Sequence, residues 1–251
     1  MYLKLDIAQE EDFPVLIAAE WHAFENPLQP IFRLYCPIIN NDRAQSIADY
    51  TARHLADRKP QQDGDRKTES QWTKVIDSDT DVIVGGAQWI FITEPSVFVE
   101  HDDSVSSLAA RHPEGGARIF ATQAFKVLVE AEAKNRIKQS EECPYRYASL
   151  GTCFTIPAYR HNGVGDLLMQ SGLKRVDERG MDAWIEAAPS AVPFYKRHGF
   201  VQKDIIQLDP RQPEGLARKE AEEWDAAARN TLPVGVCIMY RPARNDCVMS
   251  D

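Results

Sequence analysis

The chain has 251 residues, 43% of them hydrophobic, which suits one large domain with a substantial core. Acidic residues number 38 and basic residues 29, and the resulting net charge of −9 argues against a nucleic-acid partner, because such a protein needs a basic surface. The five cysteines are odd in number, widely spaced and without a Cys-x-x-Cys pair, so we expect no zinc or other metal site and no disulfide framework.

The start of the chain lacks the apolar run of a signal peptide. No stretch approaches the roughly 20 apolar residues that are needed to span a bilayer. We therefore expect a soluble, cytoplasmic protein that has no membrane partner.

The N-terminal part of the sequence combines alternating, strand-like patterns with apolar residues at helical spacing. Polar, proline- and glycine-containing stretches between them indicate loops. The elements expected here are a strand over 2–7, helices over 10–24 and 41–58, a polar surface loop over 59–70, and a hairpin of strands over 72–77 and 81–93.

The remainder of the chain follows the same two patterns and ends on a strand. Expected in order are an irregular stretch over 94–117, a helix over 118–138, a strand over 145–156, a helix over 163–179, a strand over 182–187, a short helix over 192–198, a strand over 200–208, a charged helical segment over 211–229 and a strand over 234–241. No repeat or shift in composition marks a second domain. We expect residues 1–251 to form a single α/β unit, with insertions at 94–142 and 209–231.

The segment 145–173 runs from a strand through a glycine-containing loop into a helix. A helix start offers unpaired N–H groups and partial positive charge, which suit a phosphate. Gly163 and Gly165 would let a phosphate approach the backbone, and Arg160 could grip it through its guanidinium group. The spacing alone fits a plain surface turn equally well, and the glycines of a Rossmann loop and the Gly-Lys pair of a Walker loop are missing.

The segment 182–202 follows with an apolar strand, a turn of small residues, a short helix and a Gly-Phe exit. Together, residues 145–202 resemble the GCN5-related N-acetyltransferase (GNAT) family. Their sequence looks most like that of fungal members whose substrate is unassigned. Arg160-x-x-Gly163-x-Gly165 matches the family's Q/R-x-x-G-x-G/A loop. The family's later pattern is matched by Ala191, Phe194, Tyr195, Arg197, Gly199 and Phe200.

The resemblance implies an α/β (α+β) fold with a mixed, mostly antiparallel central sheet flanked by helices. Its two parallel central strands, 145–156 and 182–187, would splay apart to admit coenzyme A. The backbone of Phe154, Thr155 and Ile156 would bind the pantetheine arm like an added strand. The pyrophosphate would lie among the N–H groups of His161, Asn162, Gly163, Val164, Gly165 and Asp166.

The resemblance also implies catalytic roles. The N–H of Cys153 would stabilise the charge that develops on the thioester carbonyl, and Tyr195 would protonate the departing thiolate. Tyr195 could instead merely pack beside its aromatic neighbours. A covalent role for the Cys153 thiol is disfavoured, because a lone cysteine on a buried strand is usually inert.

Glu186 is our candidate for the base that deprotonates the amine, directly or through a water, although a structural role has equal weight. Glu141, Glu142, His161 and His198 are weaker candidates.

Three positions depart from the family pattern. Asp166 follows Gly165 where a hydroxyl or basic residue is frequent; its carboxylate would repel phosphate, so we expect it to point away. Ala188 replaces an asparagine that touches the cofactor arm in many members, and Ser149 stands where some members carry a glutamate base.

We accordingly expect an N-acetyltransferase that uses acetyl-CoA as cosubstrate, needs no metal, and lets a primary amine attack the thioester directly. One alternative is a degenerate domain that binds coenzyme A as a regulatory module, and a second is an unrelated α/β nucleotide-binding protein. The acceptor stays open between a small-molecule and a protein amine, and a homodimer is compatible with families of this type. Residues 24–35 are the expected specificity lid over the acceptor.

Overall fold

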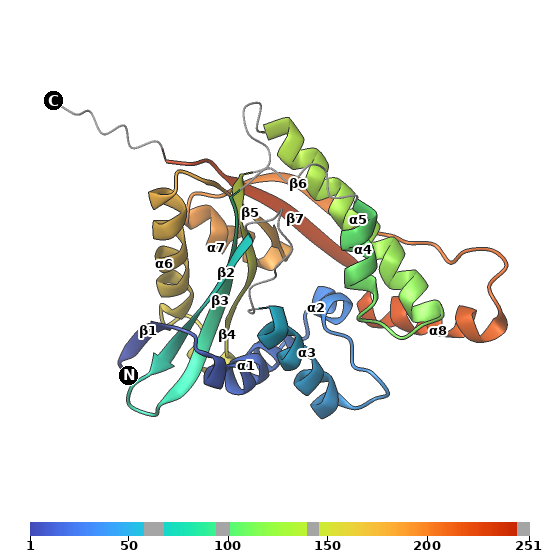
Figure 1. Cartoon of the computed structure of the whole chain (residues 1–251), viewed down its shortest axis with the longest axis horizontal. Coiled ribbons are helices and arrows are strands. Elements are labelled where there is room, and N and C mark those ends of the chain that lie inside the picture. Colours follow the sequence, from blue (N-terminus) through green and yellow to red (C-terminus); the bar gives the residue numbers. More distant parts are fainter. Residues whose placement is uncertain (58–67, 94–100, 140–145, 245–251) are drawn as a thin grey trace.

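The computed structural model of the protein describes residues 1–57, 68–93, 101–139 and 146–244 (Figure 1). Within these residues, seven strands form one sheet in the order β1-β2-β3-β4-β5-β7-β6. All neighbouring strands are antiparallel except β4 and β5. The strands are β1 (Leu3–Ile7), β2 (Thr68–Asp77), β3 (Val82–Ile92), β4 (Tyr147–Thr155), β5 (Asp182–Ala187), β6 (Val201–Leu208) and β7 (Val234–Arg241).

Helices cover both faces of this sheet. In Figure 1, α6 lies to the left of the central strands, α5 with α4 to the right, and α1 to α3 below. The helices are α1 (Phe13–Glu25), α2 (Pro30–Tyr35), α3 (Arg43–Asp57), α4 (His101–Ala109), α5 (Gly116–Gln139), α6 (Val164–Glu178), α7 (Val192–Arg197) and α8 (Arg218–Thr231), with single 3₁₀ turns at Glu10–Asp12, Pro157–Tyr159 and Pro189–Ala191. No helix in the described ranges is long and apolar enough to cross a bilayer.

Alternating side chains of the strands supply a separate core to each face. Ala148 of β4 and Ile185 of β5 pack in one cluster with Leu168 of α6, on the face that α6 and α7 cover. Phe154 of β4 packs in a second cluster with α1 and α3 on the opposite face. A third cluster joins α4, α5 and α8 to the end of the sheet formed by β6 and β7. The two faces of β4 and β5 therefore have different surroundings.

The parallel pair β4 and β5 is joined over only part of its length. Residues 147–150 pair with residues 182–185, and the printed register ends there. On the other side of β4, Leu150 pairs with Trp89 and Thr152 with Gln88, which leaves Gly151 as an extra residue in a bulge. A bulge bends its strand, so β4 turns away from β5 beyond this point. This confirms the predicted mixed, mostly antiparallel sheet with a splay between two parallel central strands.

The structure corrects several of the element boundaries. The stretch 94–117, expected to be irregular, contains α4 and the start of α5, because Val105 and Ala109 bury apolar side chains against α5. The charged segment expected to be helical from 211 begins its helix only at Arg218, since Pro213 interrupts it. Residues 68–70 extend β2 by pairing with β3 rather than forming a loop; the rest of the expected loop lies outside the described residues.

Two further boundaries concern α1 and α2. The helix expected over 10–24 begins as a 3₁₀ turn and continues as α1 to Glu25. The proline-containing stretch after α1 leads into the short helix α2, which starts at Pro30, because proline is well tolerated in the first turn of a helix. Most of the predicted lid segment 24–35 is therefore helical.

Candidate active site

The loop before α6 presents a row of unpaired backbone amides. Leu167 is the first residue whose N–H reaches a helical acceptor, the carbonyl of Gly163. Within the described chain, no backbone N–H group of residues 161–166 donates to a protein acceptor. Gly163 has φ 82°, and a Cβ atom placed on it would meet nothing within 4 Å. The start of this 15-residue helix is therefore an open, positively polarised cradle that suits an anion.

Arg160 does not project freely from this loop. Its Nη2 donates to the carbonyl of Ala23 at 2.8 Å, and its Nε donates to the carbonyl of Thr155 at 3.3 Å. Arg160 therefore ties the loop to the end of α1 and to β4. Its predicted grip on a phosphate stays a prediction, and the positioning of the loop is the role that its present contacts indicate.

Asp166 is turned towards α7. Its Oδ1 lies 2.9 Å from Nε2 of His198, the residue that follows α7. This contact accounts for a carboxylate in the first turn of α6, where it suits the helix dipole but would repel a phosphate. His161, the other histidine considered as a base, lies on the surface of the loop with φ 63°.

Along β4, the backbone N–H and C=O groups of alternate residues point towards β3 and towards the splay. Ile156 donates its N–H to the carbonyl of Val84 at 3.0 Å, and its own carbonyl accepts the N–H of Tyr159. Since residues of an antiparallel strand alternate in direction, Thr155 and Cys153 direct their N–H and C=O groups away from β3, into the splay.

The N–H of Ile156 is therefore already bonded within the sheet, and its predicted contact with the pantetheine arm stays a prediction. Phe154, two residues earlier on β4, also directs its backbone N–H and C=O groups towards β3. The centroid of its ring lies 6.4 Å from that of Phe24. The predicted pantetheine contacts of Phe154 and Thr155 likewise stay predictions, and Thr155 directs its backbone groups into the splay.

Cys153 and Tyr195 meet on the face covered by α6 and α7. Tyr195 belongs to the core cluster on this face and is 9% exposed, and the half-buried Cys153 packs against that cluster. Burial raises the pKa of Tyr195 well above its usual range, and the nearby Cys153 adds to the effect, so the phenol stays protonated at neutral pH. Burial likewise raises the pKa of the Cys153 thiol to about 12, which makes it a poor nucleophile. Tyr195 also packs against Phe194 and Phe200, with ring centroids 5.1 and 6.0 Å away.

Glu186 lies on β5 and faces the other side of the sheet. In the register of β5 and β7 it stands opposite Ile238, and its side chain is only partly buried. The hydroxyl of Tyr35, the last residue of α2, donates to its Oε2 at 2.7 Å. Burial, and then the charge of Glu132, raise the pKa of Glu186 to about 7, against the opposing effects of Tyr35 and Arg136. The predicted lid thus reaches the predicted base.

Sequence reasoning missed Glu20. This residue of α1 is 1% exposed, and its Oε2 has no hydrogen-bond partner among the described residues. Burial raises its pKa to about 7, and its only other influence is the Thr152 side chain, on β4 beside Cys153. The available signal was its position: Glu20 stands three residues after Ile17, on the apolar face of an amphipathic helix.

The remaining predicted positions lie apart from these groups. Ser149 pairs with Trp184 in the joined part of β4 and β5, below the splay. Ala188 begins the turn that follows β5. Glu141 and Glu142 lie outside the described residues. No group of three or more His, Cys, Asp or Glu side chains that could hold a metal occurs in the described ranges.

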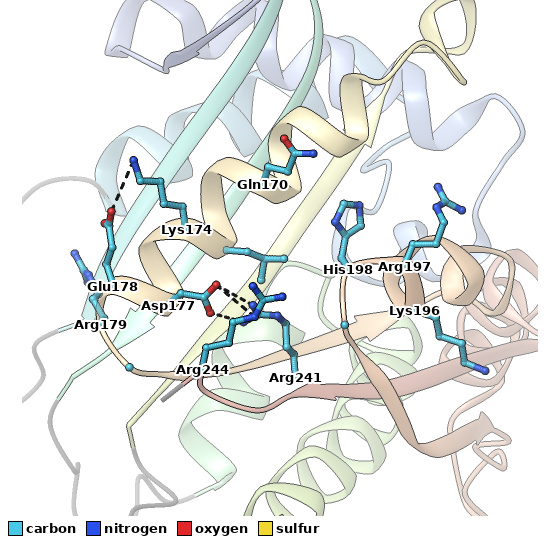
Figure 2. Close-up of a pocket in the computed structure, with 13 residues that line it drawn as sticks. Gln170, Lys174, Asp177, Glu178, Arg179, Lys196, Arg197, His198, Arg241 and Arg244 are labelled. Carbon is cyan, nitrogen blue, oxygen red and sulfur yellow. Dashed lines mark hydrogen bonds and ion pairs between the residues drawn. The ribbon is translucent and has the colours of Figure 1, made fainter. Parts of the chain in front are cut away.

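A groove of about 1120 Å³ follows the exposed side of α6, next to α7 (Figure 2). It starts at His198, the partner of Asp166, and ends where Asp177 forms a two-point ion pair with Arg241 at 2.6 and 2.8 Å. Figure 2 shows Lys196 and Arg197 at its α7 side, with no contact drawn to the other residues of the groove. Neither Tyr195 nor any residue of β4 or β5 lines this groove.

Residues 107–209 match the family model described as acetyltransferase (GNAT) domain. This segment spans the loop before α6, strands β4 and β5, and both Cys153 and Tyr195. A sequence comparison with curated proteins gives no match.

Solved acetyltransferase structures share the fold. Arylalkylamine N-acetyltransferase 2 from Aedes aegypti has a TM-score of 0.64 and 12% identity, over 97% of this chain and 100% of that one. The Drosophila melanogaster polyamine N-acetyltransferase, which forms N-acetylagmatine, has a TM-score of 0.60 and 10% identity, over 96% and 100%. A Corynebacterium glutamicum protein described as histone acetyltransferase HPA2 and related acetyltransferase has a TM-score of 0.52 and 18% identity, over 99% and 100%. At these identities the likeness concerns the fold.

Proposed function

Starting from a GNAT acetyltransferase segment on an acetyltransferase fold, we propose that the protein transfers the acetyl group of acetyl-CoA to a primary amine. The observation that carries the proposal is the row of unpaired amides at residues 161–166, which lies at the end of the strand that bends away from β5. A diphosphate at that row and a chain running along β4 would bring a thioester to Cys153.

The cofactor would be held mainly by backbone groups. The amides of residues 161–166 would receive the pyrophosphate, and Thr155 would bond the pantetheine arm as an added strand would. The N–H of Cys153, which points into the splay, would then donate to the thioester carbonyl oxygen. That bond strengthens as negative charge develops on the oxygen during attack.

The proposed reaction uses both faces of the sheet. On the face of α1, α2 and α5, Glu186 takes a proton from the ammonium form of the acceptor, and the free amine attacks the thioester carbon. The C–S bond breaks as the C–N bond forms. On the face of α6 and α7, Tyr195 gives its proton to the departing thiolate. The nitrogen then loses its second proton, which returns through water to the Tyr195 phenolate, so that free coenzyme A and a neutral acetamide leave. A phenol that is kept protonated by burial suits this role.

We propose a small cationic amine as the acceptor, with a protein amine as the second candidate. Two carboxyl groups, Glu20 and Glu186, lie on the acceptor face, and both have pKa values raised to about 7. An acceptor that arrives as an ammonium ion would favour their charged forms. The solved structures that act on arylalkylamines and on agmatine share this fold, which supports testing such amines first.

We further propose that residues 1–251 work as one catalytic domain, with 94–142 and 209–231 as insertions. Their helices α5 and α8 pack against each other, and α5 supplies Glu132 and Arg136 beside Glu186. The insertions would thus form one wall of the acceptor site.

The test combines acetyl-CoA binding with thiol release from a panel of arylalkylamines, diamines and agmatine. We expect acetyl-CoA to raise the melting temperature and at least one amine to release free thiol. Tyr195→Phe should lower kcat by about 10²- to 10⁴-fold with little change in acetyl-CoA affinity. Glu186→Gln and Glu20→Gln, measured in parallel, identify the base, because only loss of the base removes the acid limb of the pH profile.

Two results would contradict the proposal in different ways. Stabilisation by acetyl-CoA without thiol release from any amine would favour a coenzyme A-binding regulatory module. The absence of any stabilisation would remove the cofactor itself, and with it the interpretation of the loop.

A further inference from the structure

We propose that Tyr35, at the end of α2, is a positioning residue for Glu186, whose carboxylate it fixes beside the splay through one hydrogen bond from its hydroxyl. The inference rests on the proposed function, in which Glu186 is the base. Helix α2 would then have two roles: it would cover the acceptor, and through Tyr35 it would orient the base.

The contact is direct and spans the fold. The Tyr35 hydroxyl lies 2.7 Å from Oε2 of Glu186, and the two residues are 151 positions apart. Burial, and then the charge of Glu186, raise the pKa of Tyr35 well above its usual range, so the phenol keeps its proton and must be the donor. Within the described residues, no other donor bonds the Glu186 carboxylate, which leaves Oε1 available to an incoming amine.

Tyr35 is itself held from three directions. Its ring packs edge-on against Phe125 of α5, with centroids 5.2 Å apart. Its carbonyl accepts a hydrogen bond from Arg111 at 3.4 Å. Helix α2, which carries Tyr35, is anchored by an ion pair between Arg33 and Glu25. Glu25 forms a second ion pair with Arg43 of α3, at 2.6 Å. A hydroxyl held in this way can orient a partner rather than follow it.

The other charges around Glu186 come from α5. Glu132 disfavours the Glu186 carboxylate and Arg136 favours it, and these two side chains form an ion pair with each other. Their effects on Glu186 therefore oppose one another. From β7 the neighbour in register is the apolar Ile238. Of the two groups that lower the pKa of Glu186 and so favour its carboxylate, the hydroxyl of Tyr35 has the larger effect, ahead of Arg136.

The test is Tyr35→Phe, which keeps the ring against Phe125 and removes only the hydroxyl. The Glu186 carboxyl is followed by ¹³C NMR through a pH titration, and its resonance is identified by its loss in Glu186→Gln. We expect the midpoint to rise by on the order of one pH unit, because a hydrogen bond to a charged group is lost. In turnover, the acid limb of kcat/KM should move upward by the same amount, with activity recovering at high pH.

Tyr159→Phe is the matched control. It removes a tyrosine–carboxylate hydrogen bond of 2.8 Å to Asp77, at the end of β2, and should leave the Glu186 midpoint unchanged. If Tyr35→Phe fails to fold, 3-fluorotyrosine at position 35 tests the same contact with opposite sign, since its more acidic hydroxyl should lower the midpoint.

The outcomes separate the two proposals. An unchanged midpoint in the folded variant overturns the role of Tyr35, whatever the wild-type activity is. A raised midpoint in a protein that acetylates no amine supports the Tyr35 contact and removes the proposed function instead.

Discussion

Two pairs of buried or half-buried polar side chains flank the splay, one on each face of the sheet. Cys153 and Tyr195 lie with α6 and α7, while Glu186 and Glu20 lie with α1, α2 and α5. The first pair keeps its protons at neutral pH, because burial raises both pKa values far above 7. The carboxyls of the second pair titrate near pH 7. Proton donors and proton acceptors are thereby separated by the sheet.

Glu20 gives a prediction for stability. Its pKa in the folded chain, about 7, lies above the ordinary value of 4.5, so the folded state keeps a proton that the unfolded state releases. Stability should therefore fall as pH rises from about 4.5 to 7, by up to about 3 kcal/mol. Glu20→Gln removes this titration, so urea unfolding at pH 5 and pH 8 should show a smaller loss for the variant than for the wild type.

Glu222→Gln provides the control for this comparison, because Glu222 is an exposed carboxyl on α8. In this variant, the loss of unfolding free energy between pH 5 and pH 8 should equal that of the wild type. An equal loss in Glu20→Gln and the wild type would mean that Glu20 is solvated or paired.

At the scale of elements, the position of α6 determines where its free amides point. Gly172, on the face of α6 that meets the sheet, allows this approach: a Cβ atom there would lie 1.8 Å from Nε1 of Trp89 on β3. The close contact of helix and sheet fixes the start of α6 at the end of β4.

Gly172→Ala should therefore destabilise the protein although alanine favours helices. The added methyl must displace the buried Trp89 ring, at a cost of roughly 1–3 kcal/mol. Thermal unfolding measures the effect, and Ser171→Ala, one residue earlier on α6, should be nearly neutral. A melting temperature for Gly172→Ala at or above that of the wild type would contradict this packing.

The sequence predicts elements that have strong local patterns. β5 and β7 have the bounds expected from their apolar runs, and α6 begins within one residue of its predicted start. α4 and α2 were missed, because their helicity depends on packing against α5 and on the tight turn after α1, and neither is visible in local periodicity.

In the candidate site, too, features with a local sequence signal could be predicted and long-range contacts could not. The amides before α6 follow from a loop of two glycines ahead of a helix, which is a local signal. The bond of Arg160 to Ala23 and that of Tyr35 to Glu186 join residues 137 and 151 positions apart. Such contacts are set by tertiary packing, so the sequence could suggest these residues but not their partners.

For the whole molecule, the central claim is that a splayed sheet holds coenzyme A through the amides of residues 161–166. With a net charge of −9, the overall field of the protein disfavours phosphates, and a local row of backbone amides would offset this effect. A substitution that fills the cradle without disturbing the fold therefore tests the claim.

Calorimetric titration of coenzyme A into Gly163→Ala and Gly215→Ala is that test. Both glycines have φ near 80°, at 82° and 81°, and a Cβ atom would meet nothing within 4 Å at either position, so the two variants carry the same backbone strain. We predict that Gly163→Ala loses at least tenfold in coenzyme A affinity while Gly215→Ala binds as the wild type does. Equal affinities in the two variants would contradict the proposed phosphate site.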